Sequence, residues 1–298
     1  MHAAELKDVS VKYGTVKALD NVSLHLEEGE ALALLGPNGA GKTTAIGLLT
    51  GTKRVPSHTS SGKAILHGRN PRLPKSRLQM GATPQEASFP LHMKVGEILD
   101  FTQAHFKNPI PRDEIIEGFG LSDKLSRVAT QMSGGQQRNL AVALAFCGNP
   151  RAVFLDEPTT GLDLEARARI WAYVRAYRDG GGALLLTTHY IEEAEAIADR
   201  VILLNEGRIA EEGTVADILA RVNVRMLKFN ASAQPNLSSA KIESVDGNRY
   251  AYLSSDADAT VRELVTSKIE FSNLEVLPAS LEAAIETHWR KPDQGGKS

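Results

Sequence analysis

Residues 36–43 have the composition of a loop that binds phosphate groups. They fit the pattern G-x-x-x-x-G-K-[ST], in which successive backbone N–H groups surround the phosphates of a nucleotide. Glycine is needed there because a Cβ atom would obstruct both the tight turn and the close approach of a phosphate. The pattern predicts that Lys42 reaches the β- and γ-phosphates and that the Thr43 hydroxyl binds Mg²⁺. The segment is Gly36-Pro37-Asn38-Gly39-Ala40-Gly41-Lys42-Thr43, followed by Thr44.

A second glycine-rich segment, Ser133-Gly134-Gly135-Gln136, has the features of a helix N-terminus. Ser133 is a typical N-cap, Gln136 stands three positions later, and apolar residues follow at helical spacing. A helix that begins there presents free N–H groups and the positive end of its dipole to an anion. Two such segments on one chain indicate that two copies of the chain close around the nucleotide.

Two carboxylates and a histidine follow short apolar runs further along the chain. Residues 152–155 lead into Asp156 and Glu157, and residues 183–188 lead into His189. Such short runs are typical of parallel strands buried on both faces, and ligands bind at the carboxyl ends of these strands. We predict that Asp156 holds Mg²⁺, directly or through water, and that Glu157 orients and polarises the attacking water. An acidic strand end without a catalytic role is the alternative, and the phosphate loop argues against it.

The order of these segments resembles the ABC ATPase family over about residues 3–220. Tyr13, in Tyr13-Gly14, matches the aromatic residue that stacks on adenine, and residues 36–44 match the phosphate loop. Gln85, in Ala82-Thr83-Pro84-Gln85, matches the glutamine that binds Mg²⁺ and joins it to the transporter contact. The alternatives are an ordinary, partly buried tyrosine and an ordinary polar residue at a strand end.

The second half of the chain carries the rest of the family pattern. Residues 132–136 match the family signature, although Met132 stands where the family usually has leucine. In the family, the signature of one subunit covers the γ-phosphate held by the other, so two cassettes enclose two ATP molecules and hydrolysis separates them. The other matches are Asp156 for the metal-site acid, Glu157 for the catalytic glutamate, Asp163 in Gly161-Leu162-Asp163 for the dimer-contact loop, and His189 for the switch histidine.

The elements that must position these residues alternate between strands and helices. Residues 4–35 and 62–84 alternate short apolar strands with turns, and residues 86–150 have mostly helical patterns. Residues 151–204 alternate strand and helix, which is the pattern of a parallel core. We expect an α/β fold, an ABC ATPase cassette over residues 1–220. It should contain a mixed sheet core, an antiparallel β subdomain and a helical subdomain at about residues 86–150.

A small C-terminal α+β domain is predicted over residues 221–298. Its last part resembles the tail of ATPases that serve drug, antibiotic and polysaccharide exporters, and a generic stabilising appendage is the alternative. The final residues, 294–298, are expected to be disordered. Strands are expected at 224–229, 241–245, 249–253 and 274–277, with helices at about 261–269 and 281–288.

Composition favours a cytosolic protein with two folded cores. The 298 residues are 42% hydrophobic, which is enough for two domains. A formal net charge of −2 gives no reason to expect nucleic-acid binding. The single cysteine, Cys147, excludes an intrachain disulfide and falls in an apolar helical pattern.

Membrane attachment is expected to come from a partner. The longest apolar stretches are far shorter than the ~18 residues needed to cross a bilayer, and the N-terminus lacks the features of a signal peptide. The resemblance implies a membrane permease and a second cassette, identical or different. The chain would then lie in the cytoplasm against the inner face of the membrane. Phe89, Leu91 and Met93 are predicted to line a groove for a short cytoplasmic helix of the permease, and simple capping of the helical subdomain is the alternative.

ATP hydrolysis for a membrane exporter is the function that the sequence favours. The alternative is a soluble ABC ATPase that works on ribosomes or DNA. A single phosphate loop and a single signature disfavour the translation type, and residues 44–132 leave no room for the long coiled coil of DNA-repair types. The intact Lys42, Glu157 and His189 disfavour an inactive relative.

Overall fold

The computed structural model describes residues 2–54, 61–83, 88–222 and 224–278. The chain forms two compact units, residues 1–215 and 216–298, and each has its own hydrophobic core. The first unit contains all the described residues that were predicted to bind or hydrolyse a nucleotide. The predicted boundary after residue 220 falls within helix α8 (Val215–Val222) and stays a prediction.

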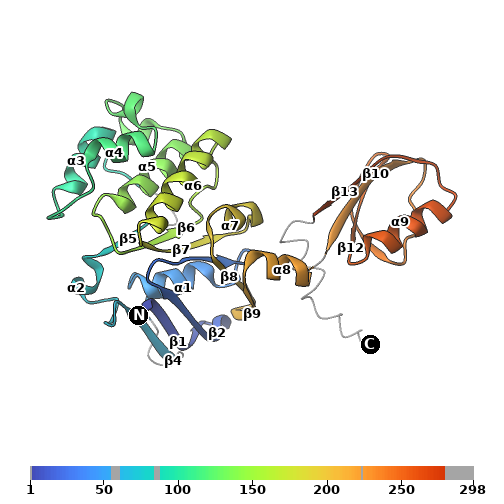
Figure 1. The fold of residues 1–298 in the computed structure, drawn as a ribbon, viewed down its shortest axis with the longest axis horizontal. Coiled ribbons are helices and arrows are strands. Elements are labelled where there is room, and N and C mark those ends of the chain that lie inside the picture. Colours follow the sequence, from blue (N-terminus) through green and yellow to red (C-terminus); the bar gives the residue numbers. More distant parts are fainter. Residues whose placement is uncertain (1, 55–60, 84–87, 223, 279–298) are drawn as a thin grey trace. The chain divides into compact units, whose positions relative to one another are not determined.

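A three-stranded antiparallel sheet opens the first unit (Figure 1). Its order is β2-β1-β4, with β1 at His2–Tyr13, β2 at Val16–Glu27 and β4 at Ser61–Leu66. Most apolar side chains of β1 and β2 are buried while most of their polar neighbours are not, as expected for a sheet with one face on a core. The predicted antiparallel subdomain is therefore confirmed.

A six-stranded mixed sheet carries the predicted strand ends. Its order is β5-β6-β7-β3-β8-β9; the first five strands are parallel and β9 is antiparallel to β8. Every residue of β3, β6 and β7 is buried, which explains their uninterrupted apolar runs. The strands are β3 (Ala31–Leu35), β5 (Met80–Ala82), β6 (Ala152–Asp156), β7 (Ala183–Thr188), β8 (Arg200–Asn205) and β9 (Arg208–Gly213).

Helices cover both faces of this sheet (Figure 1). Helix α1 (Lys42–Leu49) lies between it and the antiparallel sheet, whereas α5 (Gly134–Phe146) packs on β5 and β6 from the other face. The remaining helices of the unit are α2 (Pro74–Arg77), α3 (Val95–Gln103), α4 (Arg112–Gly118), α6 (Leu164–Asp179) and α7 (Ile191–Ile197), with short 3₁₀ turns at Ser122–Lys124 and Ala129–Gln131. The helical region predicted between the sheet strands is thus present in the described residues.

The second unit is an antiparallel sheet in the order β11-β12-β10-β13, with α9 packed against it (Figure 1). Its core includes Phe229, Tyr252 and Leu264, and the rings of Phe229 and Tyr252 stack with centroids 5.7 Å apart. The predicted α+β content is present, whereas the predicted helix at 281–288 and the tail lie outside the described residues. The elements are β10 (Arg225–Ala231), β11 (Ala240–Asp246), β12 (Arg249–Ser254), α9 (Ala257–Thr266) and β13 (Phe271–Pro278).

Candidate nucleotide-binding and hydrolysis site

The glycines of the loop between β3 and α1 are required by close backbone packing. Gly36 has φ +154°, and a Cβ atom there would lie 2.2 Å from the carbonyl oxygen of Leu204. Gly41 has φ +109°, and a Cβ atom would lie 2.4 Å from the carbonyl oxygen of Ala18. Both positions combine a left-handed backbone with contacts that no side chain tolerates. The glycine spacing of the sequence motif is therefore imposed by the fold as well.

The first turn of α1 fits an anion. Its N-cap is Gly41, which supplies no side-chain hydrogen bond, and no acidic residue stands in the turn. Helix N-termini with unpaired N–H groups and positive dipole favour phosphate. The buried Lys42 ammonium donates hydrogen bonds to the carbonyl oxygens of Gly36 at 2.6 Å and Pro37 at 3.1 Å. A compact positive site is thus assembled between β3 and α1.

Asp156 lies buried at the carboxyl end of β6, which is separated from the loop strand β3 by β7 alone. Its Oδ1 accepts a hydrogen bond from the Thr187 hydroxyl at 2.5 Å, and its backbone N–H donates to the Thr83 hydroxyl at 3.0 Å. These bonds fix the carboxylate beside the residue that follows it, Glu157. An oriented carboxylate together with the Thr43 hydroxyl is an oxygen donor set that suits Mg²⁺.

Glu157 joins the loop lysine and the histidine. Its Oε1 lies 3.9 Å from Nζ of Lys42 and 3.6 Å from Nδ1 of His189. Glu157 has φ +50°, a left-handed conformation that costs a non-glycine residue of order 1–3 kcal/mol. The His189 Nδ1 is buried and makes no hydrogen bond with the described residues. Three residues from distant parts of the sequence therefore meet at one edge of the parallel sheet.

The segment at residues 133–136 forms the predicted helix N-terminus. The Ser133 hydroxyl accepts a hydrogen bond from the Gln136 N–H, and the Gln136 Oε1 accepts one from the Ser133 N–H, both at 3.3 Å. A Cβ atom at Gly135 would lie 2.5 Å from the carbonyl oxygen of Gly161. This helix start therefore packs on the loop that ends at Asp163, which is the N-cap of α6.

The helix start and the phosphate loop are on different sides of the sheet. Helix α1 and helix α5 cover opposite faces of it (Figure 1). The two glycine-rich segments thus begin helices that belong to separate layers of the unit.

Known proteins are similar to this chain in sequence and in fold. Residues 19–160 match the family model described as ABC transporter. A daunorubicin/doxorubicin resistance ATP-binding protein of Streptomyces peucetius is 33% identical over 236 residues, 76% of this chain and 70% of that protein. A Nod factor export ATP-binding protein of Paraburkholderia xenovorans (strain LB400) is 34% identical, with 73% of both chains covered. The chain belongs to the ABC transporter ATP-binding proteins.

Solved cassettes have the same architecture as this ABC protein. The ATP-binding subunit of an ABC transporter superposes with a TM-score of 0.65 at 26% identity, covering 74% of this chain and 92% of that one. A dimeric cassette bound to ADP and Pi in a post-hydrolysis state superposes with a TM-score of 0.63 at 23% identity, covering 71% and 98%. ABC cassettes form dimers, and membership in a transporter family implies a permease partner. This protein is an ABC ATPase subunit that binds ATP and hydrolyses it for transport.

Two further residues were predicted to belong to the site, Tyr13 and Gln85. Tyr13 ends β1 with 44% of its surface exposed, just before the turn at Gly14. An exposed ring at a strand end is available for stacking on a base. Gln85 lies outside the described residues.

Sequence reasoning missed the polar groups that position the two acids. Arg138, on α5, donates from Nε and Nη2 to the carbonyl oxygen of Glu157 at 3.2 and 2.9 Å, and Nη2 also donates to the carbonyl oxygen of Asp156. Thr83 and Thr187 hold the acids from the neighbouring strands. A charge within the apolar stretch 138–146 was the available signal for Arg138. The threonines become recognisable only after the strands are paired.

An apolar hollow of about 390 Å³ lies between β5 and the helical region of the cassette. Phe89 lines it, together with Phe106 and Leu144. Of the other predicted groove residues, Leu91 is 75% exposed, and neither it nor Met93 is among the lining residues. The groove prediction therefore rests on Phe89. Among the described residues, no helix is both long and apolar enough to cross a membrane.

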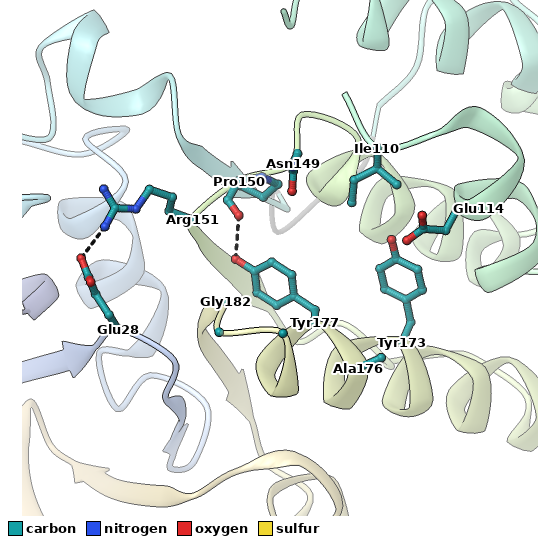
Figure 2. Close-up of a pocket in the computed structure, with 12 residues that line it drawn as sticks. Glu28, Ile110, Glu114, Asn149, Pro150, Arg151, Tyr173, Ala176, Tyr177 and Gly182 are labelled. Carbon is teal, nitrogen blue, oxygen red and sulfur yellow. Dashed lines mark hydrogen bonds and ion pairs between the residues drawn. The ribbon is translucent and has the colours of Figure 1, made fainter. Parts of the chain in front are cut away.

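A second hollow, of about 460 Å³, lies at the opposite ends of the strands (Figure 2). Tyr177 on α6 donates its hydroxyl to the carbonyl oxygens of Pro150 at 3.1 Å and Ala183 at 3.4 Å, and Tyr173 points toward Glu114. Burial raises the pKa of both tyrosines well above 10. Both hydroxyls remain neutral, and that of Tyr177 braces the starts of β6 and β7. This hollow is thus remote from the acids at the far ends of the same strands.

Proposed function

We propose that this ABC protein powers an exporter, as one of two cassettes attached to a separate membrane permease. The observation that carries the proposal is the meeting of Lys42, Glu157 and His189 at the carboxyl ends of β3, β6 and β7. Export is the direction in the printed name of the Nod factor relative, and resistance to daunorubicin in that of another. A role on ribosomes or DNA has no supporting observation.

In this proposal each site residue has one task. Lys42 binds the β- and γ-phosphates, along with the N–H groups of residues 36–44. Thr43, Asp156 and Gln85 hold Mg²⁺, which supplies charge neutralisation on the phosphates. Glu157 orients water for in-line attack and takes its proton, and His189 contacts the γ-phosphate from beside Glu157. The orientation of Glu157 by Thr187 and Arg138 supports this division of roles.

The second cassette completes each site in this proposal. Tyr13 stacks on adenine, while Ser133, Gly134, Gly135 and Gln136 of one subunit contact the γ-phosphate bound by the other. Asp163 belongs to the loop against which that helix packs, so it lies at the same subunit contact. Support comes from the location of α1 and α5 on opposite faces of the sheet, because one chain then offers its two anion-binding ends to different partners.

Attachment to the permease is proposed at the hollow lined by Phe89. An apolar groove of this size fits the apolar face of a short helix, here a cytoplasmic helix of the membrane subunit. This contact would hold the chain at the inner face of the membrane. Because Gln85 lies four positions before Phe89, closure around ATP would reach the permease through one short segment.

Co-purification from the native membrane tests this proposal. Phe89→Asp should retain ATP binding but lose the membrane subunit and export. Phe101→Asp is the matched control, because Phe101 is 62% exposed and does not line the hollow; it should keep both. If Phe89→Asp still assembles and transports normally, the permease binds elsewhere. If wild-type protein never retains a membrane protein, the exporter function is wrong.

A further inference from the structure

Three side chains that commonly bind transition metals lie together on the antiparallel sheet. His2 on β1 faces Glu27 on β2 across the strand pair, and His25 stands two residues before Glu27, so its side chain points to the same side. One ligand atom from each residue lies within 4.8 Å of the other two. Among the described residues this is the one group of three or more such side chains. It stands at the end of β1 opposite Tyr13 and shares no residue with the nucleotide site.

We propose that His2, His25 and Glu27 bind a divalent transition metal, with Zn²⁺ as the reference ion. In tetrahedral sites the metal lies about 2.0–2.2 Å from histidine nitrogen and carboxylate oxygen, which places ligand atoms roughly 3.3–3.5 Å apart. Nδ1 of His2 is 2.9 Å and Nε2 of His25 is 3.8 Å from the same Oε1 of Glu27. These two spacings bracket the tetrahedral value, and the third, between the two histidines, is within 4.8 Å, so side-chain rotations would have to bring the three atoms to one ion.

The surroundings of the three residues leave them accessible to an ion and do not place an uncompensated positive charge beside it. The histidines and Glu27 are each 43% exposed at their side chains, so an ion reaches them from solvent. Arg200 lies close by and donates to the carbonyl oxygen of His25 at 2.7 Å. Its guanidinium is paired with Glu30 at 2.6 Å and with Glu212, so its charge is compensated. Three protein ligands leave a fourth position for water, as in open zinc sites.

The alternative is a simple ion pair between His2 and Glu27, which requires a protonated imidazole. Metal binding requires the neutral imidazole instead. The ion pair and the metal site can therefore be distinguished by measuring Zn²⁺ binding, because only the metal site binds Zn²⁺ with one-to-one stoichiometry. A bound ion would join the first residue of β1 to the end of β2. It would also raise the unfolding temperature of the protein in proportion to the logarithm of free metal.

The test is calorimetric titration of Zn²⁺ into the full chain, stripped with chelator, free of any histidine tag and without nucleotide. We expect one site per chain, with affinity reduced at least about tenfold by either His25→Ala or Glu27→Gln, since each removes one of three ligands. Absorption bands of bound Co²⁺ should be lost in the same variants. His105→Ala removes an exposed histidine in the turn after α3 and should leave Zn²⁺ binding unchanged.

Asp156→Asn separates this site from the catalytic acids. If Zn²⁺ affinity falls in that variant and not in His25→Ala, the ion binds at the nucleotide site and the proposal is wrong. Absence of stoichiometric binding to the wild type would equally overturn it. Because neither readout involves ATP or a permease, both outcomes are independent of the exporter function. Circular dichroism of each variant shows whether the fold is retained.

Discussion

The backbone of Glu157 is held by contacts that do not involve its side chain, so the side chain can be substituted without displacing the backbone. The main chain is anchored by its N–H donating to the Thr187 carbonyl at 3.1 Å and by its carbonyl accepting from Arg138. Among the described residues, the carboxylate accepts one long hydrogen bond, from the Thr160 hydroxyl at 3.4 Å, and lies near Nζ of Lys42 and Nδ1 of His189. A substitution here therefore alters chemistry more than position.

Glu157→Gln should keep ATP binding and nearly abolish turnover. The amide cannot take a proton from water, and general-base catalysis contributes about 10²–10⁴-fold, while the loop and the Mg²⁺ ligands stay intact. The variant should accumulate as a dimer in MgATP, seen by size-exclusion chromatography beside a phosphate-release assay. Glu165→Gln, an exposed acid on α6, serves as the control with normal activity. An unchanged rate in Glu157→Gln would remove this residue from catalysis.

A second carboxyl, Glu193 on α7, is buried at 1% exposure, and neither oxygen makes a hydrogen bond with the described residues. Burial raises its pKa above the ordinary value of 4.5, and the nearby Thr188, Thr159 and Trp171 oppose the shift only in part. The folded protein therefore holds this proton more tightly than the unfolded chain does. Its contribution to stability is fully present below pH 4.5 and is lost as pH rises through the folded-state pKa.

Glu193→Gln should remove this pH dependence. Above pH 4.5 the variant should gain stability relative to the wild type, by at most about 1.4 kcal/mol per pH unit, until the raised pKa is passed. Urea unfolding at several pH values from 4.5 upward measures the difference. Glu192→Gln, at the exposed neighbouring position, should follow the wild type. Parallel pH profiles for Glu193→Gln and the wild type would show that Glu193 does not titrate differently on folding.

At the scale of elements, α5 is fixed by a glycine contact. A Cβ atom at Gly135 would lie 2.5 Å from the Gly161 carbonyl oxygen, whereas one at Gly134 would meet nothing within 4 Å. Gly135→Ala should destabilise the first unit by about 1–3 kcal/mol, as overpacking does, and Gly134→Ala should leave stability unchanged or slightly raised. Denaturant unfolding of the pair measures this. Equal stability of the two variants would mean that the helix start moves freely.

The elements were more predictable than the contacts between them. Strands β3, β6 and β7 can be predicted from the sequence because strands buried on both faces are largely apolar. The Ser133–Gln136 capping box can be predicted because its residues are close in sequence. By contrast, Arg138 reaches a backbone carbonyl 19 positions away, and no local pattern encodes that. The neighbours His2, His25 and Glu27 became visible only once β1 and β2 were paired in register. The register of β1 with β2 depends on how the whole core packs, and the types of the individual residues do not specify it.

At the scale of the molecule, one chain presents two halves of different sites. Helices α1 and α5, which begin at the two glycine-rich segments, cover opposite faces of the sheet (Figure 1). In the proposed arrangement the start of α5 contacts the γ-phosphate bound by the other subunit, so a complete site would require a second chain. Assembly of two copies follows mass action, and the assembled fraction of a weak dimer rises with protein concentration. ATP hydrolysis should therefore report on association as well as on chemistry.

We expect the purified chain, without its permease, to hydrolyse ATP slowly and with a specific activity that rises with concentration. In the dilute regime, where most chains are monomers, the total rate of hydrolysis should be proportional to the square of the protein concentration, because only the dimer contains complete active sites. Phosphate release measured over about a hundredfold dilution, with the mass determined by light scattering at each point, tests this expectation. Ser133→Arg should bind ATP as the wild type does, because the loop is untouched, but show no rise in activity. Constant specific activity in a demonstrably monomeric wild type would mean that one chain completes its own site.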